Sequence, residues 1–239
     1  MNVIVVESKN DKAFINALVS HLNIANTEVD PPIAINKEDF IITHGTDPNP
    51  IKPTLLTRKL KDVKADIRKK DIQNIGIVLD IDNNSFGDRF LMLNKAIKDA
   101  FSGEFTNFNE ITEISRFFQM NYGPDIINFA CYFTNVSESG DLETLLKNLK
   151  SQNSDYADCL GSWKTCIEQN GKTITSKEFD KFWVSNYLRF DTCIDRDRNQ
   201  AQRFCSMASF DYIMENKSYI FNLDSDLLSD LQAFLRLFN

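Results

Sequence analysis

Two stretches of the sequence set the expected architecture: NVIVVE at residues 2–7 and IGIVLD at residues 75–80. Both are continuous aliphatic runs that end in an acidic residue, as is typical of parallel strands buried on both faces of a sheet. Apolar residues at helical spacing follow each run, at residues 13–22 and at residues 86–101. Strands that alternate with helices predict an α/β fold in which right-handed crossovers connect a parallel sheet.

Two more strands are predicted in this part of the chain, at residues 39–43 and 126–134. A helix with strongly basic outer faces is expected between the second and third strands. Its apolar face consists of Leu56, Leu60, Val63 and Ile67. Residues 103–125 are poorly periodic, and no element is assigned to them.

From about residue 151 onward the apolar pattern is helical only. A capping box formed by Thr175 and Glu178 predicts the start of one helix, and an apolar stripe over residues 227–238 predicts the last. We therefore predict an α/β domain over residues 1–150 and a helical extension over residues 151–239 that packs on it.

The composition limits the classes of function. A net charge of −7 argues against a protein that holds nucleic acid by a broad basic surface. No run of 18 uncharged apolar residues is present, and we interpret the start of the chain as a strand and not as a signal peptide, so no membrane segment is expected.

The cysteines indicate a reducing compartment. They are Cys131, Cys159, Cys166, Cys193 and Cys205. This odd and scattered set has no CxxC spacing and is accompanied by only two histidines, which argues against a zinc site. We expect reduced, buried thiols in a cytoplasmic protein.

Acidic residues fall at the carboxyl ends of the predicted strands, where open parallel sheets bind their ligands. Glu7 ends the first strand, Asp80 ends the third, and Asp82 follows on the same side of an extended backbone. If these strands are neighbours, the carboxylates meet, and two charges about 4 Å apart repel by on the order of 4 kcal/mol. An all-oxygen site of this charge selects a hard cation, so we predict Mg²⁺ or Mn²⁺.

Each acid also has a simpler interpretation. A single acid at the end of a strand usually faces water. Ser8 and Asp11 are spaced as a helix cap, and Glu143 lies at the start of a predicted helix, where an acid interacts favourably with the helix dipole. The more specific signal is the order of the motifs, because a strand ending in Glu precedes a strand ending in Asp-x-Asp by about 70 residues.

These residues resemble the Toprim domain of topoisomerases, primases and OLD-type nucleases. VIVVESKNDKAF (residues 3–14) resembles its first motif, a strand ending in Glu with an Asp four residues later, and IGIVLDID (residues 75–82) resembles its second. SGDLETLL (residues 139–146) is similar to the Gly-x-Leu-Glu motif of a small Toprim-only branch near the OLD-type nucleases, and LQAFLRLF (residues 231–238) is similar to the end of those chains. Ser8 stands where many Toprim domains have Gly.

The resemblance implies a Toprim-like Rossmannoid sheet and a role for each acid. Glu7 would be a catalytic acid–base or a metal ligand, and Asp80, also catalytic, would hold Mg²⁺ together with Asp82. Asp11 would be a supporting metal ligand, and Glu143 a ligand for a second metal. Two metals about 4 Å apart can stabilise both the attacking and the leaving oxygen of a phosphodiester.

Basic residues supply candidate contacts to nucleic acid. Lys61, Lys64 and Arg68 lie on the basic helix and are predicted to face phosphates, although a solvated outer face is an equal alternative. His44 ends the predicted second strand and could touch substrate, or be a loop histidine without a role. A second basic set, at residues 189–203, alternates with aspartates and is better interpreted as local ion pairing.

The function expected from the sequence is Mg²⁺-dependent hydrolysis of DNA or RNA by a Toprim-type nuclease, serving phage defence or DNA repair. A topoisomerase or a complete primase is disfavoured, because 239 residues leave no space for a gate domain and no zinc module is present. The alternative is a non-catalytic Toprim subunit that regulates by binding nucleic acid, nucleotide or a separate ATPase, since this chain has no phosphate-binding loop of its own. A structural module with incidental acids, and assembly into a homo-oligomer, also stay open.

Overall fold

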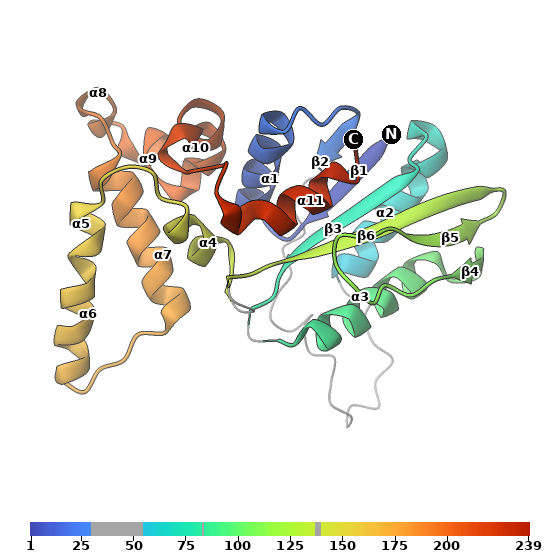
Figure 1. Cartoon of the computed structure of the whole chain (residues 1–239), viewed down its shortest axis with the longest axis horizontal. Helices are drawn as coiled ribbons and strands as arrows, with labels where there is room; N and C mark the ends of the chain where they lie inside the picture. Colours follow the sequence, from blue (N-terminus) through green and yellow to red (C-terminus); the bar gives the residue numbers. More distant parts are fainter. Residues whose placement is uncertain (30–54, 83, 137–139) are drawn as a thin grey trace. The chain divides into compact units, whose positions relative to one another are not determined.

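The computed structural model describes residues 1–29, 55–82, 84–136 and 140–239. They form two compact units, an α/β unit made of Met1–Phe133 and Asp230–Asn239 and a helical unit made of Thr134–Ser229 (Figure 1). The units divide near residue 133, whereas the predicted domain boundary is residue 150. The end of the chain belongs to the α/β unit and not to the helical one.

The α/β unit is built on a six-stranded sheet with the order β2-β1-β3-β6-β5-β4. The strands are β1 (Asn2–Val6), β2 (Thr27–Val29), β3 (Asn74–Asp80), β4 (Phe105–Phe108), β5 (Phe118–Tyr122) and β6 (Asp125–Thr134). β1 pairs in parallel with β2 on one side and with β3 on the other, whereas β5 runs antiparallel to both β4 and β6. The α/β class is confirmed, with a mixed sheet in place of a purely parallel one.

The strands predicted from continuous apolar runs are present as β1, β3 and β6. The predicted strand at residues 39–43 lies outside the described residues. The segment 103–125, which had no assignment, contains the antiparallel pair of β4 and β5. None of the four residues of β4 is fully buried, so this strand has no buried apolar face to mark it, whereas β5 alternates over only five residues.

Helices cover both faces of this sheet (Figure 1). Their bounds are α1 (Lys9–His21), α2 (Leu55–Lys70), α3 (Phe86–Phe101) and α11 (Ser229–Arg236). Helices α2 and α3 lie on one face, where Leu60 and Leu93 share a hydrophobic core with Ile77 of β3. Helices α1 and α11 lie on the other face.

The C-terminal segment packs closely on β3 because the strand carries a glycine at that point. A Cβ atom added to Gly76 would lie 2.7 Å from Cζ of Phe238 and 3.0 Å from Cζ of Phe234. Both phenylalanines are fully buried, and their rings are 5.3 Å apart. Gly76 therefore provides the space in which the aromatic side chains of the chain end reach the sheet.

A row of asparagine amides crosses the strands at the amino-terminal end of the sheet. Asn128 Nδ2 donates to Asn74 Oδ1, and Asn74 Nδ2 donates to Asn2 Oδ1, both at 2.8 Å. Asn2 Nδ2 in turn donates to the carbonyl oxygen of Phe238 at 2.6 Å. The row ties three strands and the chain end together with paired polar groups, as buried amides require.

The helical unit consists of short helices. Their bounds are α4 (Leu142–Asn148), α5 (Asp155–Asp158), α6 (Leu160–Gln169), α7 (Ser176–Asn186), η2 (Tyr187–Asp191), α8 (Asp195–Arg198), α9 (Ala201–Phe204), η3 (Met207–Ser209), α10 (Phe210–Asn216), η4 (Ser218–Ile220) and η5 (Asp226–Leu228). The capping box predicted at Thr175 and Glu178 begins α7, with both of its reciprocal hydrogen bonds formed. Stacked rings of Trp183 and Tyr187, 5.2 Å apart, are part of the interior of this unit.

The prediction that all five cysteines are reduced is wrong for two of them. Cys193 and Cys205 form a disulfide, with their Cα atoms 5.6 Å apart. Cys131 is a free, buried thiol, and Cys159 and Cys166 are free and exposed. The pairing has no signature in the sequence, because it depends on how α8 and α9 fold back between the two cysteines.

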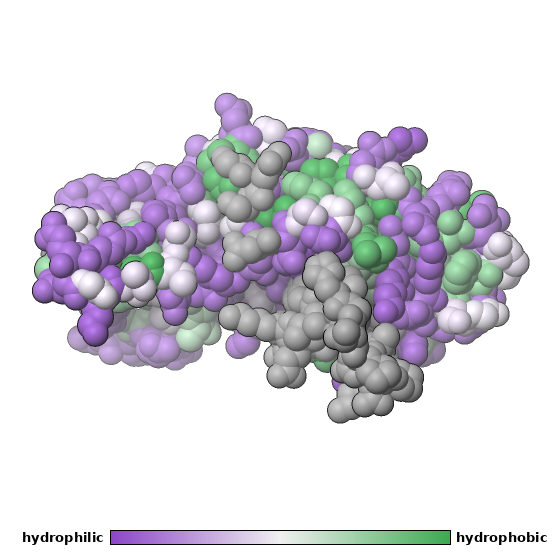
Figure 2. Space-filling view, turned by 90° about the horizontal axis from the view of Figure 1, so that it is seen from below, coloured by the Kyte–Doolittle hydropathy of each residue, from purple (hydrophilic) through white to green (hydrophobic). Residues whose placement is uncertain are grey.

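The surface shown in Figure 2 is mostly hydrophilic, with hydrophobic residues gathered in separate patches. Within the described part of the chain, no helix combines the length and the apolar character needed to cross a bilayer.

We predict that Gly76→Ala destabilises the α/β unit by about 1–3 kcal/mol, because the methyl group overlaps the ring of Phe238 and the core must shift. The matched control is Gly87→Ala in α3, where the nearest atom is 3.6 Å from the added Cβ and the expected change is neutral or slightly stabilising. Denaturant unfolding followed by near-UV circular dichroism measures both. Equal stability of the two variants would contradict the close packing of the C-terminal segment on β3.

Candidate functional site

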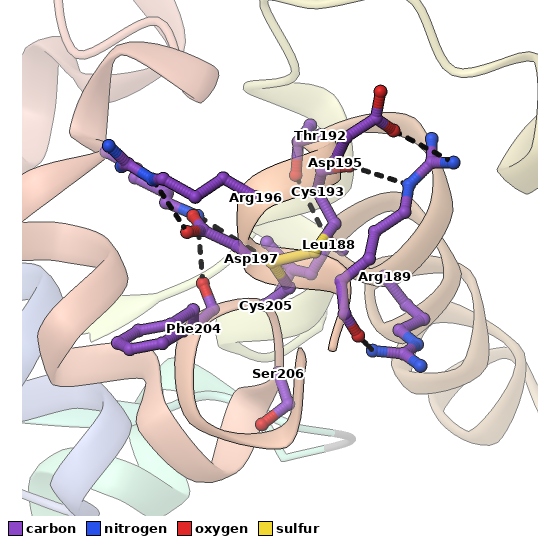
Figure 3. Close-up of a disulfide and its surroundings, with 12 residues drawn as sticks. Leu188, Arg189, Thr192, Cys193, Asp195, Arg196, Asp197, Phe204, Cys205 and Ser206 are labelled. Atoms are coloured by element: carbon purple, nitrogen blue, oxygen red, sulfur yellow. Dashed lines mark hydrogen bonds and ion pairs between the residues drawn. A yellow bond between two sulfur atoms is a disulfide. The ribbon is translucent and has the colours of Figure 1, made fainter. Parts of the chain in front are cut away.

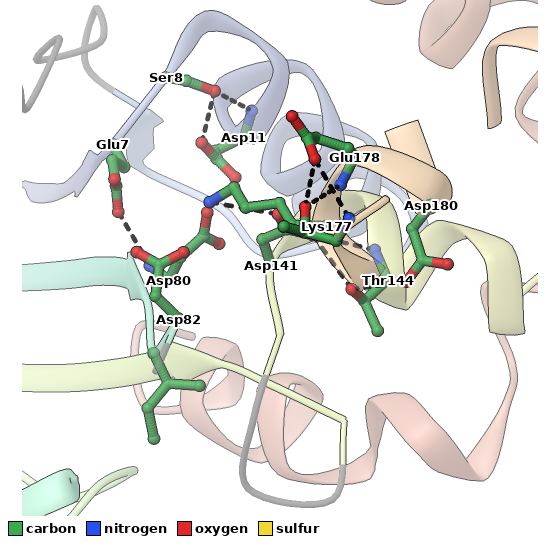
Figure 4. Close-up of polar contacts among 12 residues, drawn as sticks. Glu7, Ser8, Asp11, Asp80, Asp82, Asp141, Thr144, Lys177, Glu178 and Asp180 are labelled. Atoms are coloured by element: carbon green, nitrogen blue, oxygen red, sulfur yellow. Dashed lines mark hydrogen bonds and ion pairs between the residues drawn. The ribbon is translucent and has the colours of Figure 1, made fainter. Parts of the chain in front are cut away.

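The pairing of β1 with β3 brings two of the predicted acids together. The strands are parallel, with Val6 opposite Val78, so both end at the same edge of the sheet. Glu7 follows β1 directly, and its Oε2 accepts a hydrogen bond of 3.0 Å from the backbone amide of Asp80, the last residue of β3 (Figure 4). The predicted neighbourhood of these two residues is therefore present.

Asp82 is held in a different way from the one expected. The sequence predicts an extended backbone through this residue, but β3 ends at Asp80 and Asp82 has a φ of 50°. This left-handed conformation is uncommon for a residue with a side chain, although Asp tolerates it better than most. The carboxylate of Asp82 lies 3.2 Å from the guanidinium of Arg89.

Asp11 belongs to the cap of α1. The side chain of Ser8 accepts a hydrogen bond from the backbone amide of Asp11, and its hydroxyl donates to Asp11 Oδ2 at 2.5 Å. This arrangement is the simple helix cap that the spacing allowed. Asp11 is nevertheless buried and close enough to Glu7 to act on it electrostatically.

Arg89 is the residue of this site that the sequence analysis missed. It extends from α3, its side chain is 1% exposed, and Nη2 donates to the carbonyl oxygen of Ile81 at 3.3 Å as well as to Asp82. Its position offered a signal, because residue 89 lies three residues after Phe86 and four before Leu93, on the apolar face of the helix. A charged residue at such a position must be paired when the helix packs.

The electrostatics of the edge are dominated by burial of negative charge. Burial is the main cause that raises the pKa of Glu7 to about 7, and the charges of Asp11 and Asp82 act in the same direction. The hydrogen bond from the Asp80 amide and the charge of Arg89 oppose this shift. Burial also lowers the pKa of Arg89, which Glu7, Asp82 and Asp80 oppose. Three carboxyl groups thus share one guanidinium, and a fourth, that of Asp11, adds its charge near Glu7. Additional positive charge would be favourable here.

Two helices begin at the same edge. Helix α1 starts at Lys9, directly after Glu7 and Ser8, and α3 starts at Phe86, capped by Ser85. The amino ends of helices carry partial positive charge and free backbone amides, which favour carboxylates and phosphates. The edge therefore combines groups that attract cations with elements that attract anions.

The acids match a hard cation in chemistry but are not arranged around one. Carboxylate oxygens are the ligands that Mg²⁺ and Mn²⁺ prefer. Within the described residues, however, no three side chains of His, Cys, Asp or Glu are grouped so that they could hold a metal ion. Glu7 is directed to a backbone amide and Asp82 to Arg89, so these side chains would have to turn to bind a cation together.

The other predicted site residues are not part of this cluster. Glu143 lies in the first turn of α4 in the helical unit, and its role as a ligand stays a prediction. On α2, Lys61 is exposed, Lys64 pairs with Glu104 at 2.7 Å, and Arg68 pairs with Asp125 at 3.7 Å.

These ion pairs favour a solvated outer face for that part of α2, although its contact with nucleic acid stays a prediction. His44 lies outside the described residues.

One comparison with known proteins identifies a family. The model of a family described as "Protein of unknown function (DUF3226)" matches residues 1–239. No curated protein and no solved structure matches the chain.

We predict that Glu7→Gln stabilises the metal-free protein at pH 8 relative to wild type, and does so much less at pH 4.5. Because the pKa of Glu7 is raised from 4.5 to about 7, the folded state binds more protons than the unfolded state in this window, so wild-type stability falls as the pH rises through it. The full difference in the free energy of unfolding between Glu7→Gln and the wild type is about 3 kcal/mol. Chemical denaturation in EDTA at several pH values measures it.

The control for this experiment is Glu113→Gln, which removes an exposed carboxylate paired with Arg116 and is expected to change stability by less than about 1 kcal/mol. A pH-independent difference between Glu7→Gln and wild type would contradict the burial of a charged Glu7.

Proposed function

The chain belongs to the DUF3226 family, and we propose that it is a Mg²⁺- or Mn²⁺-dependent phosphodiesterase of the Toprim type that hydrolyses DNA or RNA. The observation that carries the proposal is the hydrogen bond between Glu7 and the Asp80 amide, which unites the ends of two neighbouring parallel strands. Asp11 and Asp82 add negative charge around Glu7. This is the edge at which open α/β sheets bind ligands.

The residues of the edge suit phosphodiester hydrolysis. Asp80 and Asp82, with Glu7 or Asp11, would hold the cation, which would supply positive charge to the phosphate and lower the pKa of a bound water. Glu7, with a pKa of about 7, can accept or release a proton at neutral pH. The amino ends of α1 and α3 would attract the phosphate.

A second candidate is a non-catalytic subunit that binds nucleic acid, nucleotide or a separate ATPase. The observation that favours it is Arg89, whose buried guanidinium already neutralises Asp82. An internal counter-ion allows an acidic edge to persist without a metal. The Toprim relationship, a cytoplasmic location, these partners, a homo-oligomeric state and a role in phage defence or DNA repair remain part of the proposal.

We expect the protein to cleave labelled single- or double-stranded DNA or RNA in the presence of Mg²⁺ or Mn²⁺ and to stop when EDTA is added. Asp80→Asn keeps the shape of the side chain but removes its charge, and should lower the cleavage rate at least about 100-fold. Asp99→Asn, which changes an exposed acid of α3, should leave the rate unchanged. Full activity in Asp80→Asn would exclude the catalytic assignment of this residue.

We expect saturating Mg²⁺ to raise the melting temperature of the wild type, since a ligand at about 100 times its Kd stabilises the native state by about 2.7 kcal/mol. In EDTA, Arg89→Met should cost about 1–3 kcal/mol, because it leaves the partly buried carboxylate of Asp82 without its guanidinium. Added Mg²⁺ should recover part of this loss, and so produce a larger shift than in the wild type.

The matched control is Arg116→Met, which removes an exposed pair with Glu113 and should cost less than about 1 kcal/mol. If Mg²⁺ shifts neither the wild type nor Arg89→Met, the edge binds no divalent cation and the non-catalytic candidate stands.

A further inference from the structure

The disulfide of the helical unit encloses a short segment with little structure of its own. Cys193 and Cys205 are 3% and 2% exposed, and the chain between them forms only α8 and α9, of four residues each (Figure 3). Ala201 is the one further buried hydrophobic residue in the small cluster around the disulfide, and Phe204 packs against that cluster. Helices this short are not stable in isolation, so the bridge and these few contacts hold the segment in place.

A buried lysine lies beside one of the two sulfur atoms. Lys217 follows α10 and is 6% exposed. Its ammonium nitrogen lies 3.6 Å from Cys205 Sγ, 2.5 Å from Asp197 Oδ2 and 3.1 Å from the carbonyl oxygen of Phe204. A lysine ammonium has three protons to donate, and three acceptors surround it here. The third of them is a sulfur atom, which accepts weakly in a disulfide and strongly as a thiolate.

The lysine is paired with a carboxylate. The hydrogen bond from Lys217 holds the pKa of Asp197 below its ordinary value, as expected for a carboxylate paired with an ammonium ion. Arg196, whose Nε lies 3.4 Å from Asp197, adds a second cation, and Tyr212 presents its ring to Lys217 at 5.9 Å. Among the described residues, no ammonium or guanidinium donates to Cys193 Sγ, so the two sulfurs differ in their electrostatic environment.

We propose that Cys193–Cys205 is a reversible thiol–disulfide site, opened by a thiol reductant that attacks Cys193 and releases Cys205 as a thiolate bound by Lys217. In the first step the reductant's thiolate forms a bond with Cys193 Sγ while the bond to Cys205 breaks, and Cys205 Sγ takes the electron pair. A second reductant thiolate then attacks the mixed disulfide and releases Cys193. The bridge gains two electrons, and two thiols of the reductant become a disulfide.

The preference for Cys205 as the leaving group follows from the position of the ammonium. A neighbouring cation stabilises a thiolate, and the more stable thiolate leaves faster. Once the bridge is open, the contacts of Lys217 with Asp197 and Phe204 are among the few that still hold α8 and α9. We therefore expect residues 194–204 to lose protection from hydrogen exchange. The site requires neither metal nor nucleic acid, so its test is independent of the proposed hydrolysis.

The experiment measures the oxidised fraction of Cys193 and Cys205 in glutathione buffers, by alkylation and peptide mass spectrometry. A Cys159→Ser/Cys166→Ser background removes the two exposed thiols. We expect reversible reduction while far-UV circular dichroism shows that the protein stays folded. Lys217→Met should raise the equilibrium ratio of disulfide to dithiol in a given glutathione buffer by about tenfold. Asp197→Asn leaves the ammonium without its carboxylate and should lower this ratio.

Because Lys217→Met leaves a buried carboxylate behind, the neutral pair Lys217→Gln/Asp197→Asn serves as a second variant that keeps the hydrogen bond. It should also favour the disulfide relative to the wild type. A bridge that resists glutathione until the protein unfolds, or a balance that is the same in all variants, would overturn the proposal and leave a structural disulfide only.

Discussion

The parallel pairing of β1 with β3 is the constraint on which the candidate site depends. It places the ends of two strands side by side, so that a carboxylate from one accepts a hydrogen bond from the backbone of the other at Glu7 and Asp80. Each strand then continues into a turn that begins a helix, which brings Asp11 and Arg89 to the same edge. The charge balance of the edge is therefore a consequence of strand order, and the buried guanidinium is what makes several close acids tolerable.

Much of the framework could be predicted because it follows from local patterns. A continuous apolar run that ends in an acid specifies both a buried strand and the residue at its carboxyl end, which is how Glu7 and Asp80 were found. Helix caps are equally local, since Thr175 and Glu178 need only each other and the backbone between them. Such features depend on a few neighbouring residues, and long-range contacts do not alter them.

The remaining features depend on contacts that a single sequence does not display. The left-handed backbone at Asp82 is specific to its turn. The carboxylate of Asp82 is oriented by its ion pair with Arg89. The burial of Arg89 is apparent only once α3 is known to pack on the sheet. The bridge between Cys193 and Cys205 arises from a chain reversal without a sequence signature. The sequence does not reveal the mixed sheet because β4 has no fully buried residue and β5 is only five residues long, so the apolar alternation of this segment is short.

The contact of Phe234 and Phe238 with Gly76 has a consequence for synthesis. The helical unit is an insertion between β6 and α11, so about 100 residues separate the sheet from the segment that closes one of its faces. A ribosome would deliver all of β1, β3 and β6 long before Asp230 emerges. During that interval the sheet surface around Gly76 lacks its aromatic cover, and α1 is the helix already present on that face.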